Sequence, residues 1–171
     1  MNYNKSYVSR MYIQAIGYIA DGDLLSEMFD TMSDAPSLLK ILGFEIFLKC
    51  ILKVHFPDSK NHTHNYYKLW QKLPNQLKAN IIEGAQQRYT IHANYQNMQK
   101  LLTSWQKVFE KARYYYEFYE DKTQEEYENI GEEWIAKGML EDEAKVSYYP
   151  TELNGLIEGM SDYIKNTLAE K

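Results

Sequence analysis

The sequence predicts an all-α protein: an up-and-down antiparallel bundle of four to five main helices, with a short helical excursion before the last helix. Proline occurs only at positions 36, 57, 74 and 150, and the segments between these points repeat their apolar residues with the period of a helix. No run alternates convincingly in the two-residue pattern of a strand. The length of 171 residues suits one core, so we expect a single domain over residues 1–171.

The first expected helix covers residues 7–32, and its inward stripe consists of Val8, Tyr12, Ala15, Ile19 and Leu24. The second helix covers residues 35–55, because a Ser or Asp before Pro36 can accept the free amides of a first turn that suits proline. Its apolar residues point in every direction, so we expect other helices to surround it.

A short helix at residues 66–73 and another at 75–89 should follow, whereas residues 90–96 suit either a turn or a helix continuation. We then expect a long helix at 97–121, a short one near 125–140 and a final one from residue 150 onward. The helices at 7–32, 35–55 and 97–121 and the final one should form the bundle, with residues 122–149 as the excursion.

Charged residues recur every fourth position in the otherwise apolar stretch 44–56, at Glu45, Lys49 and Lys53. A buried charge is tolerated only when it is paired and hydrogen-bonded. Glu45 and Lys49 lie one turn apart, with the acid first, which is the favourable order for a pair within a helix. The segment therefore predicts an ion pair on the central helix.

Arg113 and Glu117 repeat this spacing on the expected helix at 97–121. Two helices that each offer an acid and a base can close a polar network across a bundle, and His64 precedes the short helix at a place from which it could reach that network. We predict a buried polar network, or a binding site, with these members: Glu45, Lys49, His64, Arg113 and Glu117.

Charge is unevenly distributed along a chain whose net charge is −5. Residues 40–113 hold twelve Lys and Arg against four acids, and residues 117–143 hold eleven acids against two lysines. Such blocks are usually solvated faces. A sharper interpretation is that the basic 40–113 region binds RNA or a nucleotide, and that the acidic stretch covers or competes for it.

Composition points to a cytoplasmic protein without a membrane span. The longest apolar runs fall short of the roughly 20 residues that cross a bilayer. The apolar N-terminal segment contains Gln14 and continues into acidic residues without a cleavage-like site, so we expect no export. Cys50 is the only cysteine and cannot form an internal disulfide, which agrees with a reducing compartment.

No cofactor and no metal are expected. His55, Asp58, His62 and His64 could be drawn as a metal site, but they lack the fixed spacing of a closed site. The sequence also contains no Gly-rich phosphate loop and no nucleophile elbow, so a conventional hydrolase or nucleotidase is not expected.

Four segments, LGFEIFLKCIL, HNYYKLWQKLP, FEKARYYYE and YYPTELNGLI, resemble in order and spacing the bacterial members of the HEPN-like helical superfamily. The resemblance covers residues 5–121 and 148–168. It implies an up-and-down bundle of four or five helices that frequently dimerises. It also implies a bacterial defence or toxin–antitoxin setting.

Nuclease members of this superfamily carry an Arg, four to six intervening residues and a His on a late helix, and two copies of the motif meet at a dimer interface. The implied chemistry is RNA cleavage without a metal, in which His transfers a proton and Arg holds the charge that grows on the phosphate. The nearest match in this sequence is Arg88 and His92, with three intervening residues, and no His follows Arg113 in the chain. This site departs from the family pattern.

Three functional hypotheses follow from these observations. The first is a HEPN-like interaction or binding module, non-catalytic or divergent, that forms a homodimer or binds a protein partner. The second is a metal-independent endoribonuclease with a composite dimer site built from Arg88 and His92. The third is a protein that binds RNA or a nucleotide without cleaving it, with phosphate contacts from Lys49, His64 and Arg113.

Overall fold

The computed structural model describes residues 3–28, 34–89, 93–111, 116–117, 119–138 and 147–169. Within these segments the regular structure is entirely helical, which confirms the all-α prediction. The helices, in chain order, are α1 Lys5–Glu27, α2 Ala35–His55, α3 Tyr66–Gln71, α4 Asn75–Arg88, α5 Met98–Lys111, α6 Gln124–Ala136 and α7 Pro150–Ala169.

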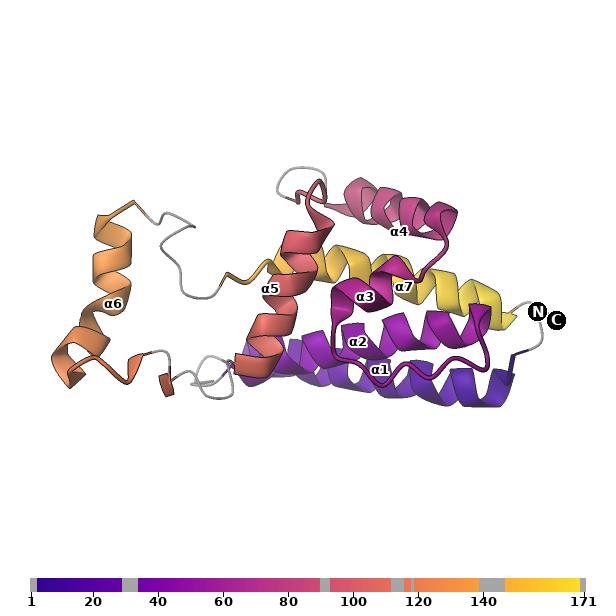
Figure 1. The fold of residues 1–171 in the computed structure, drawn as a ribbon, viewed down its shortest axis with the longest axis horizontal. Helices are drawn as coiled ribbons and strands as arrows, with labels where there is room; N and C mark the ends of the chain where they lie inside the picture. The colour runs from indigo at the N-terminus through magenta and orange to yellow at the C-terminus, as the bar shows by residue number, and fades with distance from the viewer. Residues whose placement is uncertain are drawn as a thin grey trace.

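The helices α1, α2, α4 and α7 lie lengthwise in the molecule (Figure 1). α1 and α2 lie side by side and run in opposite directions, α7 lies against both, and α4 packs along the other side of α7 in the opposite direction. The start of α1 and the end of α7 meet, since the Tyr3 hydroxyl donates to the Thr167 carbonyl oxygen at 3.2 Å. The result is a helical bundle.

The structure differs from the prediction in the helix that completes this bundle. α5 crosses the long helices instead of running along them (Figure 1), and it contacts α2 and α3. It ends at Lys111, whereas the predicted helix continued to residue 121, and Tyr116 and Glu117 lie in a 3-10 turn. α4 takes the expected place of α5, because its buried residues Ile81 and Ala85 pack against Gly159 and Gly155 of α7.

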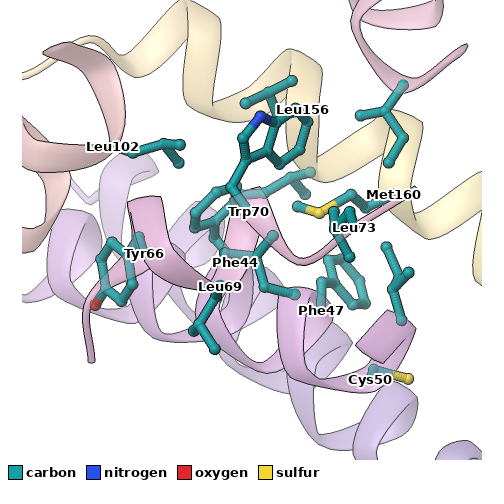
Figure 2. Packing of buried hydrophobic residues seen from close by; sticks show 14 of the residues in the cluster. Phe44, Phe47, Cys50, Tyr66, Leu69, Trp70, Leu73, Leu102, Leu156 and Met160 are labelled. Atoms are coloured by element: carbon teal, nitrogen blue, oxygen red, sulfur yellow. The ribbon is translucent and has the colours of Figure 1, made fainter. Parts of the chain in front are cut away.

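α2 is the central helix of the fold, as predicted from its apolar residues. Ten of its residues are buried: Ile41, Gly43, Phe44, Glu45, Phe47, Leu48, Cys50, Ile51, Leu52 and Val54. Figure 2 shows the core beside it, where side chains of α2 and α3 meet Leu102 of α5 and Leu156 and Met160 of α7. α3 is only six residues long, but it buries Tyr66, Leu69 and Trp70 between its neighbours.

Two glycines permit close approach of the long helices. A Cβ at Gly43 of α2 would lie 2.6 Å from Cγ1 of Ile19 in α1, and a Cβ at Gly159 of α7 would lie 2.9 Å from the Ile81 carbonyl oxygen in α4. Both distances are shorter than the normal contact between non-bonded heavy atoms. A larger residue at either position would therefore force its neighbours to move.

α6 forms the helical excursion that precedes the last helix, as the sequence predicted. It begins with a capping box, in which the Thr123 hydroxyl accepts from the Glu126 amide and the Glu126 carboxylate accepts from the Thr123 amide. None of its residues is buried, and Figure 1 shows it apart from the other helices. The capping box and the helix's own hydrogen bonds thus hold α6 without burial against the core.

Candidate functional site

Glu45 is the buried charge at the centre of the candidate site. Its side chain is only 4% exposed, and the Lys49 ammonium donates to its Oε1 at 2.6 Å from one turn further along α2. Burial removes water from the carboxylate, so hydrogen-bond donors of the protein must replace the lost hydration. Lys49 supplies one of these donors.

His64 supplies a second contact to the same carboxylate. Its Nδ1 lies 3.0 Å from Glu45 Oε2, although α2 and the following loop separate the two residues in sequence. The ring also stacks on Phe109 of α5, with centroids 5.7 Å apart and planes inclined by 26°. Three elements therefore meet at this cluster: α2, the loop before α3, and α5.

The loop that carries His64 is held in place by lysines at both ends. Lys53 donates to the carbonyl oxygens of Pro57 and Ser59, at 2.8 and 2.6 Å. Lys72 donates to the side-chain oxygen of Asn61, which is itself buried. Lys53 lies in α2 and Lys72 directly follows α3, so the two flanking helices hold the loop that brings His64 to Glu45.

The geometry limits the chemistry of this cluster, which we call the Glu45 cluster: Glu45, Lys49, His64 and Phe109. A carboxylate that holds one nitrogen of an imidazole leaves the other nitrogen on the opposite edge of the ring, and the His64 side chain is 56% exposed. Such a pair can transfer protons. The remaining oxygen of Glu45 is occupied by Lys49, so the ammonium and the imidazole are both bound to one carboxylate.

Of the other two predicted members of the network, only Glu117 lies within the described residues, and it does not join this cluster. Glu117 is exposed and lies in the 3-10 turn after α5, contrary to the expectation of a buried ion, because α5 ends before it. Arg113 lies outside the described residues. The structure thus brings together Glu45, Lys49 and His64 from the predicted set.

Arg88, the predicted catalytic arginine, is bound by two acids of α7. Its Nε lies 3.3 Å from Glu158 Oε2, and its terminal guanidinium nitrogen donates to Asp162. The neighbouring Tyr89 hydroxyl donates to Glu158 at 2.7 Å, and this bond, together with burial, raises the pKa of Tyr89 to about 12. His92 lies outside the described residues. Arg88 therefore forms part of the α4–α7 seam.

No family model, curated protein or solved structure matches the chain. The resemblance to the HEPN-like superfamily depends on the four sequence segments alone and stays a prediction.

Many cations of the basic 40–113 region have partners within the fold. Lys40 pairs with Asp23 at 2.6 Å, and Lys49, Lys53, Lys72 and Arg88 make the contacts given above. Each of these cations is therefore held by an acid or by an oxygen of a neighbouring loop. Within the described segments, no three His, Cys, Asp or Glu side chains form a group that could hold a metal ion, and no helix has the length and apolar character needed to cross a membrane.

An exposed face on α1, which we call the α1 outer face, was not predicted from the sequence. Its members follow one side of the helix and are all exposed: Ser6, Arg10, Ile13, Gly17, Ala20, Leu24 and Glu27. The side chains of Ile13 and Leu24 are among the most exposed large apolar groups, at 68% and 62%. Leu24 had been expected on the inward stripe, of which Val8 and Ala15 are buried. This face could have been predicted, because Ile13, Gly17, Ala20 and Leu24 form a second row of apolar residues at helical spacing.

Proposed function

We propose that the chain is a non-catalytic protein-interaction module of the HEPN-like helical superfamily. The α1 outer face carries this proposal. Ile13 and Leu24, with Ile16 of the same helix and Met28 at its C-cap, leave large apolar side chains exposed to water. Contiguous exposed apolar surface is costly for a folded protein and commonly marks a site where another protein binds.

The contacts of the basic residues favour binding over catalysis. An arginine that stabilises the charge of a cleaved phosphate must reach that phosphate. Arg88 is instead bound by Glu158 and Asp162, and a phosphate would have to compete with two carboxylates. Lys49 is likewise neutralised by Glu45. The bacterial defence or toxin–antitoxin setting rests on the family resemblance.

A capture experiment with the tagged full-length chain tests this function. The parent is compared with the double variant Ile13→Glu/Leu24→Glu, which places charge on the α1 outer face, and with Ile135→Glu, which alters an equally exposed apolar residue on α6. We expect specific protein partners, including untagged copies of the chain, to bind the parent and Ile135→Glu but not the double variant.

Helix content and melting temperature by circular dichroism should be unchanged in all three proteins, since each altered side chain is exposed. If the double variant retains every partner of the parent, the α1 outer face is not the interaction surface. The proposal would then lose its principal support.

A further inference from the structure

The α1 outer face repeats with the spacing of a helix-pairing seam. Its members from Arg10 to Glu27 alternate steps of three and four residues, the heptad pattern that two helices use when they pack along their length. The opposite side of α1 carries its own buried seam, with Val8, Ala15 and Gly22 spaced seven residues apart. One helix thus presents two seams, and the seam against the core is filled.

We infer that the α1 outer face binds the same face of a second copy of this chain, with the two α1 helices antiparallel. The inference rests on the proposed function, because it names the partner of that same surface. The two-fold axis passes between Gly17 and Ala20, close to the middle of the helix. Positions at equal distances from this midpoint then face each other across the axis.

The apolar residues are complementary in this register. Ile13 faces Leu24 of the second copy on each side of the axis, and Gly17 faces Ala20 at the centre. The small residues at the centre let the two backbones approach, while the large ones beside them fill the space. A Cβ at Gly17 would meet no atom within 4 Å in the single chain, so this position is open to an approaching helix.

The charges select the antiparallel direction. Arg10 faces Glu27 of the second copy at both ends of the seam, which places opposite charges together twice. In a parallel pair each residue would face its own copy, and like charges would meet. In the single chain Arg10 donates to the Ser6 hydroxyl at 2.9 Å, and Glu27 forms no ion pair with the described residues.

The same pattern identifies the occupant as a second copy rather than an unrelated helix. A two-fold interface requires one surface to be complementary to itself, with each residue facing a different residue that it suits. The α1 outer face meets this requirement in its large apolar residues, its small residues and its charges. An unrelated partner would require no such internal symmetry.

Charge reversal combined with sedimentation equilibrium tests the pairing. Arg10→Glu and Glu27→Arg should each weaken dimerisation about tenfold or more, because each creates two like-charge encounters. The double variant Arg10→Glu/Glu27→Arg should restore the affinity of the parent, since it exchanges the charges without changing their sum. Glu132→Arg on the exposed α6 is the matched control and should leave dimerisation unchanged.

Cysteine cross-linking tests the register. Mixing Ile13→Cys with Leu24→Cys should give a disulfide-linked heterodimer under mild oxidation. Each variant alone should cross-link slowly, because positions 13 and 24 are separated by about 16 Å along a helix. A parallel pair would give the reverse result. The native Cys50 is buried and should not contribute.

The outcomes separate this inference from the proposed function. Association that responds to the charge variants and shows the mixed cross-link supports it. A chain that stays monomeric at millimolar concentration overturns it. So does a dimer that is indifferent to the α1 variants. In either case, loss of a different protein partner in Ile13→Glu/Leu24→Glu would leave the proposed interaction function intact.

Discussion

The imidazole of His64 reaches a carboxylate, Glu45, that the core has almost removed from water. Nδ1 and Oε2 lie 3.0 Å apart, and the Lys49 ammonium holds the other oxygen of the same carboxylate at 2.6 Å. One buried acid therefore joins the central helix to the loop before α3. The arrangement accounts for a charge on a helix whose other inward residues are apolar.

We expect Glu45→Ala to lower the free energy of unfolding by about 1–3 kcal/mol. The loss stays below that of a fully buried ion pair, because Lys49 and His64 are 21% and 56% exposed and can regain water. Urea unfolding measures the change, with Glu132→Ala on α6 as an exposed control. A change of a few tenths of a kcal/mol would show that the Glu45 cluster does not stabilise the fold.

A double-mutant cycle on Arg88 and Asp162 should give a coupling energy of about 0.5–1 kcal/mol. The two side chains are 38% and 48% exposed, so solvent and salt weaken their attraction. Arg88→Gln, Asp162→Asn and the double variant are compared by urea unfolding at low and high salt. We expect the coupling to shrink as salt rises. Zero coupling at low salt would mean that the pair does not help join α4 to α7.

Incubation with a mixed RNA pool should yield no cleavage products, even at a large excess of protein. The reason is that Arg88 is bound to α7 by two carboxylates. Gel analysis of the parent beside Arg88→Ala and His92→Ala provides the test. Products that appear with the parent and vanish with both variants would establish the ribonuclease hypothesis and remove the non-catalytic proposal.

Cys50 should resist thiol reagents in the folded protein. Burial raises the pKa of its thiol from 9.0 to about 12, and the Sγ contacts the Val8 carbonyl oxygen at 3.6 Å. Few thiolates therefore form at pH 8, and access is blocked. Mass spectrometry should detect maleimide labelling only when urea unfolds the chain. Rapid labelling without denaturant would contradict the burial of this residue.

The same pKa shift predicts a loss of stability in alkali. The unfolded chain releases the Cys50 proton above pH 9, whereas the folded chain retains it until about pH 12. The contribution is thus complete below pH 9 and is lost as the pH rises through this window. Cys50→Ala should flatten this part of the stability profile, measured by urea unfolding between pH 8 and pH 11.

His55 should contribute an acid-sensitive part of the stability. Burial lowers its pKa from 6.5, and its Nε2 lies 2.7 Å from the Tyr163 hydroxyl on α7. Below pH 6.5 the unfolded chain takes up a proton more readily than the folded one, so stability is present above that pH and falls below it. His55→Gln should reduce the slope of unfolding free energy between pH 6.5 and pH 5. An unchanged slope would exclude this residue as its source.

The helices were predictable because their signals are local. The period of apolar residues and the Pro36 start signal predict α2 with the bounds that the structure shows, and its all-round apolar surface predicts its central place. The end of α5 was missed, because the apolar period continues past Lys111 in the sequence although the described helix stops there. The apolar periodicity of each segment cannot show whether α4 or α5 packs along α7.

The pair of Glu45 and Lys49 could be read from the sequence, since a spacing of four residues places two side chains together on any helix. The ion pair of Arg88 with Asp162 and the exposure of Leu24 could not be predicted in this way. Both depend on how α4, α7 and α1 are rotated about their axes, and that rotation is set by packing the whole core at once. Local spacing orders residues along one helix, whereas contacts between helices follow from the sum of many weak apolar interactions.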